Sequence, residues 1–199
     1  MGRLKVVLAS TNEGKLRELR ALFPEWDIEP LAADYPDETG ETFYDNARAK
    51  AEFARALVAR AASVMGEDSG LEVDALGGRP GIRSARFAGA DAGDNENVQL
   101  LLRELDGVPD DARSARYVSE LVLLPSEDED EKRGTGTLEG RIATEPCGSE
   151  GFGYDPVFVP AGQERTVAEL GDAWKRENSH RARAAKALRQ RLGNLPHGV

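Results

Sequence analysis

Residues 67–89 read EDSGLEVDALGGRPGIRSARFAG, and the rest of the chain is organised around this stretch. Two adjacent carboxylates, Glu67 and Asp68, follow the apolar run within residues 61–65 and precede Ser69-Gly70, which predicts acids at the end of a strand. Carboxylate oxygens are the ligands that Mg²⁺ prefers, usually one or two together with substrate phosphates. The stretch therefore indicates a metal site, and the alternative is a surface turn with solvated charges.

Composition limits the classes of protein to which the chain can belong. Its 199 residues are enough for one large domain or two small lobes. With 26 basic and 36 acidic residues the net charge of −10 argues against a nucleic-acid partner, although a local basic pocket for a small anion is compatible with it. The single cysteine, Cys147, excludes an intrachain disulfide and a cysteine-based zinc site. Without an apolar run of transmembrane length or a signal peptide, the sequence predicts a cytoplasmic protein with no membrane partner.

The first 23 residues predict a strand, a polar loop and a helix. Residues 4–9 (LKVVLA) are apolar and β-branched, and residues 16–23 place Leu and Phe on one helical face. Free backbone N–H groups at such a helix start favour an anion, and a lysine adds a full positive charge. The alternative is that Asn12 only caps the helix and Lys15 is solvated. The loop in question consists of Ser10, Thr11, Asn12, Glu13, Gly14 and Lys15.

A long helix is predicted after residue 42. Thr42 and Asp45 form a capping-box signal, and apolar residues then recur at helical spacing as far as Ala61. Asn46 and Lys50 share one face of this helix, so Lys50 can point into a cleft, or it can be ordinary surface charge. Glu38 precedes the start of the same helix. The apolar positions are Phe43, Ala47, Ala51, Ala54, Leu57, Val58 and Ala61.

The remaining pattern mixes strands and helices. Strands are predicted at residues 26–31, 115–124 and 134–144, and a helix is predicted at residues 94–105. The acidic run 126–131 favours an exposed hairpin connection between two of these strands. Because strands and helices alternate early and strands dominate the middle, the pattern predicts an α/β fold with a mixed sheet.

Two stretches near the C-terminus carry further polar and aromatic chemistry. Residues 148–156 (GSEGFGYDP) form a glycine-rich loop in which Phe152 can stack on a flat base or, alternatively, pack in the core. His180 and Arg181 begin a helix that Asn178 or Ser179 can cap. Cations are unfavourable near the positive end of a helix dipole, so their position indicates a ligand.

Five motifs, in order from residue 10 to residue 181, closely resemble those of the inosine triphosphate pyrophosphatase family. They are S-T-N-x-G-K, E-T-G-x-T-F-x-x-N-A-x-x-K-A, D-S-G-L-x-V-D-x-L-G-G-x-P-G-I-x-S-A-R, G-F-G-Y-D-P and S-H-R. The resemblance implies a Mg²⁺-dependent cytoplasmic homodimer that hydrolyses (deoxy)inosine and xanthosine triphosphates to the monophosphate and pyrophosphate. It also implies a single domain over residues 1–199, with an elongated two-lobed fold around a long central mixed sheet and the nucleotide in the cleft between the lobes.

The same resemblance assigns roles to individual residues. It makes Asp68 the general base and a metal ligand, Glu38 a further metal ligand, and Lys50 a catalytic residue on the triphosphate. Two residues depart from the family pattern: Glu67 stands where Asp is common, which leaves its metal role open, and Ala182 stands where Gly is common. The triphosphate would be held by Ser10, Thr11, Asn12, Glu13, Gly14, Lys15 and Ser69, and the purine and sugar by Phe152, Gly153, Tyr154, Asp155, Lys175, His180 and Arg181.

Two other functions use many of the same residues. A pyrophosphatase of pyrimidine triphosphates would have no evident need for His180-Arg181 beside Phe152. A non-catalytic nucleotide-binding protein would use the loop and the aromatic residues but would not need Asp68. Pyrophosphate release from a panel of nucleotides separates the three hypotheses.

Overall fold

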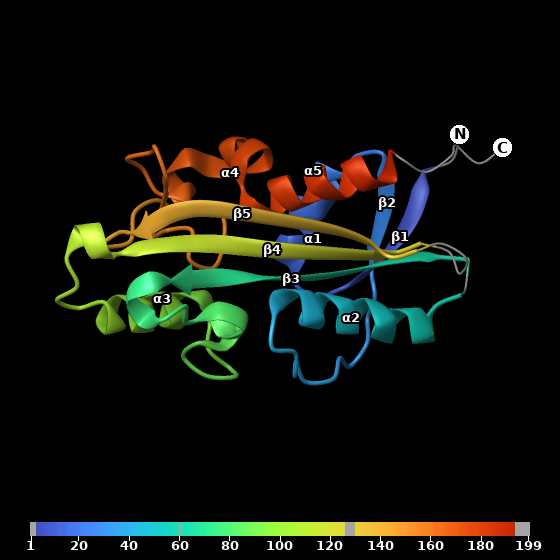
Figure 1. Cartoon of the computed structure of the whole chain (residues 1–199), viewed down its shortest axis with the longest axis horizontal. Helices are drawn as coiled ribbons and strands as arrows, with labels where there is room; N and C mark the ends of the chain where they lie inside the picture. Colours follow the sequence, from blue (N-terminus) through green and yellow to red (C-terminus); the bar gives the residue numbers. More distant parts are fainter. Residues whose placement is uncertain (1–2, 60, 126–129, 194–199) are drawn as a thin grey trace. The chain divides into compact units, whose positions relative to one another are not determined.

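The computed structural model describes residues 3–59, 61–125 and 130–193, which form an α/β fold with a six-stranded sheet (Figure 1). The strand order is β2-β1-β3-β4-β5-β6. β1 pairs in parallel with β2 and β3, whereas β5 and β6 are antiparallel, so the predicted mixed sheet is confirmed. The strands are β1 (Leu4–Ala9), β2 (Trp26–Pro30), β3 (Ser63–Val73), β4 (Ser114–Leu124), β5 (Lys132–Ile142) and β6 (Phe158–Pro160). The helices are α1 (Glu13–Leu22), α2 (Phe43–Leu57), α3 (Asp94–Glu104), α4 (Val167–Asn178) and α5 (His180–Leu192).

The chain divides into two compact units. The first unit comprises Met1–Asp68, Ser119–Gly136 and Arg181–Val199, and the second comprises Ser69–Val118 and Thr137–His180. Strands β3, β4 and β5 contribute residues to both units. The prediction of a single functional domain over residues 1–199 stays a prediction.

Helices cover both faces of the strands in the first unit. The apolar sides of α1 and α5 pack on β1, β2 and β4 in one buried cluster, which includes Leu19, Phe23 and Leu188. The alanines of α2 pack on the opposite face against Val64 and Val122 (Figure 1). This two-sided burial explains why β1 is an almost continuous apolar run.

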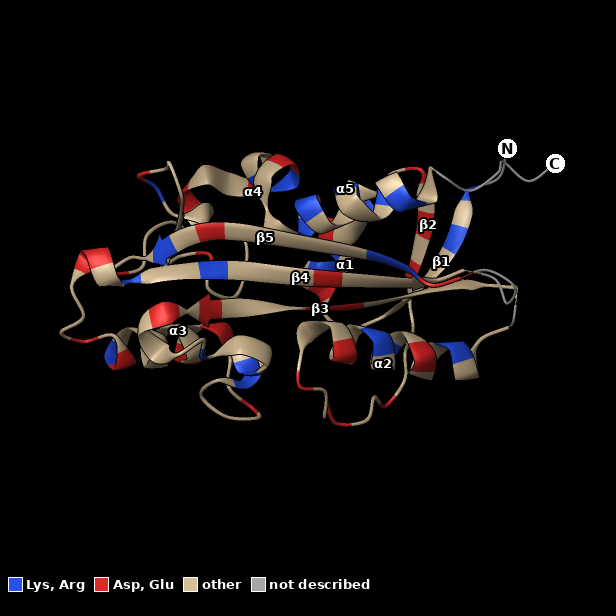
Figure 2. Cartoon of the chain, in the orientation of Figure 1, with Lys and Arg blue, Asp and Glu red and all other residues tan. Residues whose placement is uncertain are grey.

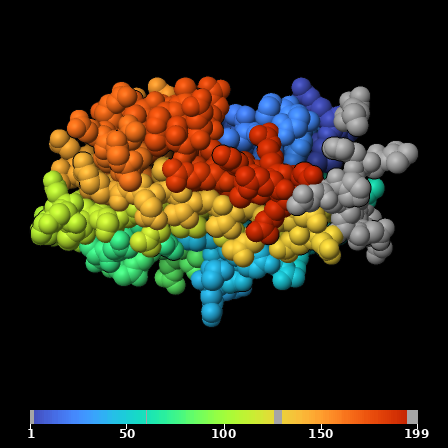
Figure 3. Space-filling view, turned by 45° about the horizontal axis from the view of Figure 1, so that its top comes forward, coloured from blue at the N-terminus to red at the C-terminus, as the bar shows by residue number. Residues whose placement is uncertain are grey.

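Two glycines allow these helices to come close to the strands. A Cβ on Gly66 would overlap the backbone carbonyl of Ala47 in α2. A Cβ on Gly134 would overlap the carbonyl of Ala184, where α5 packs against the beginning of β5 (Figure 3, red on yellow). Helix backbone can approach a strand this closely only where the side chain is absent.

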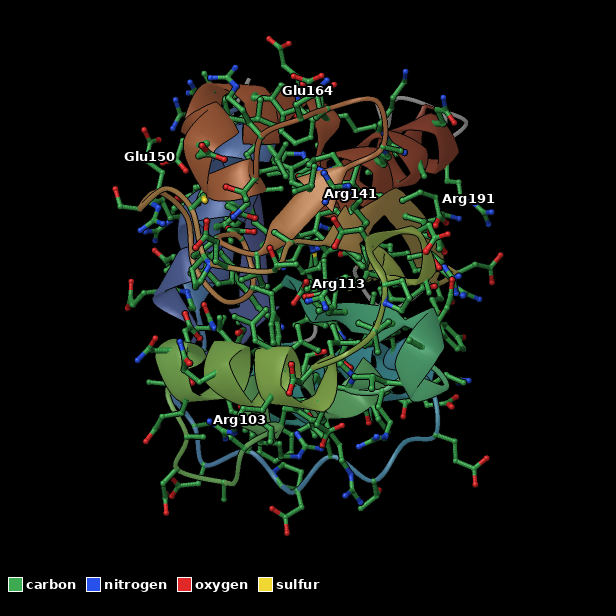
Figure 4. All side chains as sticks on the ribbon, turned by 90° about the vertical axis from the view of Figure 1, so that its left-hand side faces the viewer. Arg103, Arg113, Arg141, Glu150, Glu164 and Arg191 are labelled. Atoms are coloured by element: carbon green, nitrogen blue, oxygen red, sulfur yellow. The ribbon has the colours of Figure 1, made fainter. Side chains whose placement is uncertain are left out.

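The second unit has its own core. It joins α3, through Val98 and Leu101, to Leu71, Val73 and Phe158. Arg113 is buried in this unit, and its guanidinium donates to the carbonyls of Leu105, Ile142 and Ala143 at 2.8–2.9 Å. Figure 4 looks onto this unit with Arg113 in the middle of the view. The three carbonyls satisfy the donors that burial would otherwise leave unpaired.

Most predicted elements are confirmed, with two corrections. The predicted helix does not reach Ala61, because α2 ends at Leu57, which is exposed, and Val58 has an extended backbone. Glu67 and Asp68 do not lie at the end of a strand, because β3 continues through Ser69-Gly70 to Val73, with Leu71 and Val73 buried in the second core. The acidic connection predicted for residues 126–131 falls largely outside the described residues.

Charged residues occur on the helices, the strands and the loops, and Figure 2 shows basic residues recurring along α5. Arg183, Lys186, Arg189 and Arg191 are all exposed, so they lie on the solvated face of this helix. Among the residues that the structure describes, no helix combines the length and the apolar character needed to cross a membrane.

Candidate active site

Two consecutive carboxylates of β3 define the centre of a charged cluster in the first unit. Successive side chains of a strand point to opposite faces, so Glu67 and Asp68 face different helices. Glu67 meets Lys15 of α1 and Arg181 of α5, whereas Asp68 meets Asn46 and Lys50 of α2. We call Glu38, Glu67 and Asp68, with Lys15, Lys50 and Arg181, the carboxylate cluster.

Glu67 is fully buried and holds two cations. Its Oε2 lies 2.6 Å from Lys15 Nζ, and its Oε1 accepts from the Arg181 guanidinium at 3.0 and 3.1 Å. Burial alone raises the pKa of Glu67, but Lys15 and Arg181 outweigh it and hold the pKa well below its usual value. Glu67 is therefore ionised in the fold at neutral pH.

Arg181 is itself 1% exposed and also forms an ion pair with Glu18 of α1. Burial opposes its charge, yet Glu67 and Glu18 raise its pKa further above the usual range. The unfavourable position of this cation in the first turn of α5 is thus balanced by two carboxylates of the chain itself. Its predicted contact with a purine base stays a prediction.

Asp68 has the opposite electrostatic character. It is 4% exposed, its Oδ1 lies 3.0 Å from Lys50 Nζ, and its Oδ2 accepts from Asn46 Nδ2 at 3.2 Å. Burial raises the pKa of Asp68 more than Lys50 and Lys15 lower it, so the pKa lies above the ordinary aspartate value. A carboxylate with a raised pKa is a stronger proton acceptor, as a general base requires.

Lys50 joins the two predicted metal ligands. Its ammonium forms ion pairs with both Glu38 and Asp68 and lies 3.4 Å from the Glu67 carbonyl. Burial disfavours the charge, but Asp68 and Glu38 together raise the pKa of Lys50 above its usual value. The oxygens of Glu38 and Asp68 thus converge on one cation.

This donor set is compatible with Mg²⁺. Within residues 3–59, 61–125 and 130–193, no three acidic, histidine or cysteine side chains form a ready-made metal cluster. Two convergent carboxylates completed by substrate phosphates are, however, an ordinary set of Mg²⁺ ligands. Glu38 and Asp68 therefore fit the chemistry of the predicted metal.

The predicted phosphate loop lies at the start of α1. Ser10 Oγ accepts from the Asn12 amide at 3.2 Å, and Asn12 Oδ1 caps the helix by accepting from the Lys15 amide at 3.0 Å. Thr11, Asn12 and Glu13 are exposed, so the helix N-terminus faces solvent, where an anion can reach it. The cap is confirmed, but Lys15 is not a solvated side chain, because it binds Glu67.

A second group lies in the other unit. Asp155 Oδ2 accepts from Lys175 Nζ at 2.5 Å and from the Phe152 amide at 2.9 Å, and Lys175 Nζ lies 4.4 Å from the Phe152 ring centroid. His180 stacks on Tyr117 with ring centroids 4.5 Å apart and planes 9° from parallel. Tyr117 donates its hydroxyl to Asp155 Oδ1 at 3.3 Å. We call Tyr117, Phe152, Asp155, Lys175 and His180 the aromatic cluster.

The other predicted base-side residues lie on the same loop as Phe152. The Gly153 amide donates to Asp94 Oδ2 at 2.6 Å, and buried Tyr154 donates its hydroxyl to the Ser84 carbonyl at 2.8 Å. Burial, followed by Asp94, raises the pKa of Tyr154. Ser69 follows Asp68 directly in β3 and is half-buried.

The sequence interpretation did not identify Glu18, which forms an ion pair with Arg181 of the carboxylate cluster, or Tyr117 of the aromatic cluster. Glu18 lies outside the apolar face predicted for α1, yet it forms an ion pair with Arg181, 163 residues away in the chain. Tyr117 lies in a predicted strand without a motif that marks it, yet it contacts both His180 and Asp155. No local pattern marks either residue, because both contacts depend on packing between distant segments.

Comparison with known proteins finds similarity over nearly the whole chain. The model of the Ham1 family matches residues 6–191. The dITP/XTP pyrophosphatase of Escherichia coli (strain K12) is 44% identical over 196 residues, covering 96% of this chain and 98% of the relative. That of Geobacillus kaustophilus (strain HTA426) is 45% identical over 205 residues, covering 98% of this chain and 97% of the relative.

Solved structures are similar over the same length. The Staphylococcus aureus Ham1 protein superposes with a TM-score of 0.83 at 37% identity, covering 95% of this chain and 98% of that one. A HAM1 protein from Coxiella burnetii gives a TM-score of 0.83 at 36% identity, with 96% and 100% coverage. The family resemblance carried by the five motifs is confirmed. The fold, the full-length matches and the ordered motifs together show that this chain belongs to the Ham1 family.

Proposed function

We propose that the chain is a nucleoside-triphosphate pyrophosphatase that hydrolyses inosine, deoxyinosine and xanthosine triphosphates to the monophosphate and pyrophosphate. The observation that carries the chemistry is Asp68, a buried carboxylate with a raised pKa that shares the Lys50 ammonium with Glu38. The substrate class is supported by relatives named dITP/XTP pyrophosphatase that match nearly the whole chain at 44–45% identity.

In this proposal Asp68 accepts the proton of the water that attacks the α-phosphorus, and pyrophosphate leaves. Its burial makes it a better base than a solvated aspartate, because the protonated form costs less in a low-dielectric site. Lys50, 3.0 Å away, keeps the carboxylate ionised before the attack and orients it. Base catalysis of this kind typically contributes about 10²–10⁴-fold.

The phosphates are held by the N-terminus of α1, residues 10–15, with Ser69. Phosphoryl transfer depends mainly on positioning and on neutralising charge, which the exposed start of α1 together with Lys15 and Lys50 would supply. Mg²⁺ bound by Glu38 and Asp68 would supply further charge neutralisation on the phosphates. Without a metal, the three carboxylates of the cluster would repel the substrate.

The purine would be held by the aromatic cluster together with Gly153, Tyr154 and Arg181. Phe152 offers a ring for stacking, and Asp155 fixes the loop by accepting from the Phe152 amide and from Lys175. Stacking tolerates any base, whereas hydrogen-bond donors such as those of His180 and Arg181 favour a purine 6-oxo group over a 6-amino group. This is the physical basis proposed for preferring inosine and xanthosine.

The proposal includes the whole-protein organisation that the resemblance implies. Residues 1–199 would act as one pyrophosphatase domain with two lobes and the nucleotide in the cleft between them, and the protein would be a homodimer. Light scattering on the purified protein measures the oligomeric state, and a monomer at micromolar concentration would contradict that part of the proposal.

A pyrophosphate assay over inosine, xanthosine, guanosine, adenosine and pyrimidine triphosphates, with and without Mg²⁺, tests the activity. We expect Mg²⁺-dependent pyrophosphate and monophosphate from inosine and xanthosine triphosphates. Release of inorganic phosphate in place of pyrophosphate would overturn the reaction type. Faster turnover of pyrimidine triphosphates would support the related pyrophosphatase, and tight binding without turnover would indicate a non-catalytic nucleotide-binding protein.

A further inference from the structure

We propose that Asn46 is a positioning residue that fixes the Asp68 carboxylate relative to the loop that carries Glu38. This inference rests on the proposed function of Asp68 and Glu38. Asn46 is 1% exposed, so its amide must find its hydrogen-bond partners within the protein. Its Nδ2 donates to Asp68 Oδ2 at 3.2 Å, and its Oδ1 accepts from the Gly40 amide at 2.9 Å.

The two hydrogen bonds fix the orientation of this amide. A carboxylate can only accept and a backbone N–H can only donate, so the Asn46 side chain satisfies both partners in one orientation and neither in the flipped one. The two predicted metal ligands are thereby linked through a single side chain. Asp68 is bonded directly, and Glu38 is linked through Gly40, two residues further along the same loop.

Steric contacts hold the loop close to Asn46. A Cβ on Gly40 would lie 2.5 Å from Asn46 Oδ1 and 2.8 Å from the Cβ of Asp45, so glycine is needed for this approach. The Thr42–Asp45 capping box sets the start of α2 immediately before Asn46. The loop, the cap and the amide therefore form one ordered segment at the beginning of the helix.

The depth of Asn46 is set by the contact between α2 and β3. Gly66 lies two residues before Asp68 in the strand and packs directly on the backbone of Ala47. Ala47 follows Asn46 in the helix. Lys50, one helical turn after Asn46, then lies on the other oxygen of Asp68. The carboxylate is held at Oδ1 by an ammonium and at Oδ2 by a neutral amide.

The second unit contains a matched control. Asn97 of α3 is 3% exposed, and its amide also makes two hydrogen bonds, accepting from the Ala88 amide at 2.8 Å and donating to the Ala85 carbonyl at 3.2 Å. Asn97 contacts none of the predicted site residues through these bonds. Asn46→Ala and Asn97→Ala thus remove the same group from similarly buried sites, and only the first faces a carboxylate of the carboxylate cluster.

The test compares Asn46→Ala, Asn46→Asp and Asn97→Ala by melting temperature, by steady-state kinetics with inosine triphosphate, and by Mn²⁺ binding followed by electron paramagnetic resonance. We expect both alanine variants to melt earlier. Asn46→Ala should also lose about 10- to 100-fold in kcat and bind Mn²⁺ more weakly, as removal of a group that orients a ligand typically does. KM should change less than kcat, and Asn97→Ala should keep wild-type kcat and Mn²⁺ affinity.

Asn46→Asp separates the two hydrogen bonds. It keeps the acceptor for the Gly40 amide but places a second carboxylate against Asp68, so we expect a loss of kcat at least as large as in Asn46→Ala. If Asn46→Ala loses stability only, with the kcat and Mn²⁺ affinity of the wild type, Asn46 is a structural residue like Asn97. If the wild-type protein releases no pyrophosphate, the proposed function fails, and the Mn²⁺ comparison still decides whether Asn46 orders the carboxylates.

Discussion

The carboxylate cluster of the first unit and the aromatic cluster of the second unit are built on different principles. The first is a network of buried charges, in which Glu67 has a lowered pKa and Asp68, its neighbour, a raised one. The second is built from rings around one buried ion pair, Lys175–Asp155. Under the proposed function, we expect changes in the first cluster to act on folding and turnover, and changes in the second to act on nucleotide affinity.

The largest effect is expected from removing the negative charge of Glu67 in the carboxylate cluster. Glu67→Gln leaves Lys15 and Arg181 buried without their shared carboxylate, which should cost about 3–5 kcal/mol in the free energy of unfolding. Because the folded-state pKa lies below the ordinary 4.5, this contribution is present above that pH and is lost as the pH falls below it. Chemical denaturation of both proteins at pH 7 and at pH 4 measures the difference.

Glu25→Gln is the matched control for that experiment. Glu25 pairs with Arg189 at 2.6 Å, but both side chains are about half exposed, so its loss should cost at most about 1 kcal/mol. A similar small cost for Glu67→Gln, or a difference between wild type and variant that grows as the pH falls, would show that Glu67 does not stabilise the fold as an anion.

The next largest effect is expected for Asp68→Asn in the same cluster, where turnover and stability should change differently. Asp68→Asn should lower kcat by about 10²-fold or more, because the general base is lost. Its melting temperature at pH 7 should stay equal to that of the wild type or rise, because the raised pKa of Asp68 means that the fold disfavours the ionised carboxylate at this pH. Pyrophosphate release and thermal melting measure the two quantities, and near-normal turnover would remove Asp68 from the role of base.

A smaller effect is expected from the aromatic cluster. Phe152→Ala should raise KM by about tenfold for all purine triphosphates alike and change kcat little, since stacking contributes on the order of 1–3 kcal/mol per base. Phe152→Leu keeps the apolar volume without the ring and should behave similarly. A change in the ratio between inosine and adenosine triphosphates would instead assign base selection to Phe152.

The smallest effect concerns a residue that only the structure identified. Tyr117→Phe keeps the stack on His180 and removes the hydrogen bond to Asp155, so KM for inosine triphosphate should rise by about 2- to 10-fold at constant kcat. Tyr44→Phe removes a hydroxyl bonded to Glu131 in the first unit and should change neither constant. Identical KM values for the wild type and Tyr117→Phe would mean that the hydroxyl does not position Asp155.

Local patterns in the sequence were enough to predict most of the elements and most of the candidate residues. Periodicity predicted β1, α1, α3 and β4 nearly to their ends, and the Thr42–Asp45 signal located the start of α2, because strand and helix periods and caps are local properties of the chain. The order of five motifs was enough to predict the family, which the comparisons confirm. The path of β3 was misjudged, because the pair Ser69-Gly70 reads as a turn when its burial in a sheet is unknown.

The partner of each buried charge depends on how the helices pack on the sheet. Alternation along β3 predicts that Glu67 and Asp68 face opposite sides of the sheet. Because α1 and α5 pack on one side, Glu67 contacts Lys15 and Arg181. Because α2 packs on the other side, Asp68 contacts Asn46 and Lys50. Arg181 lies 114 residues from Glu67 in the chain, and no local pattern links them. Ion-pair partners this far apart in the chain depend on which segments the fold buries together. A buried charge is stable only where the fold brings an opposite charge to it.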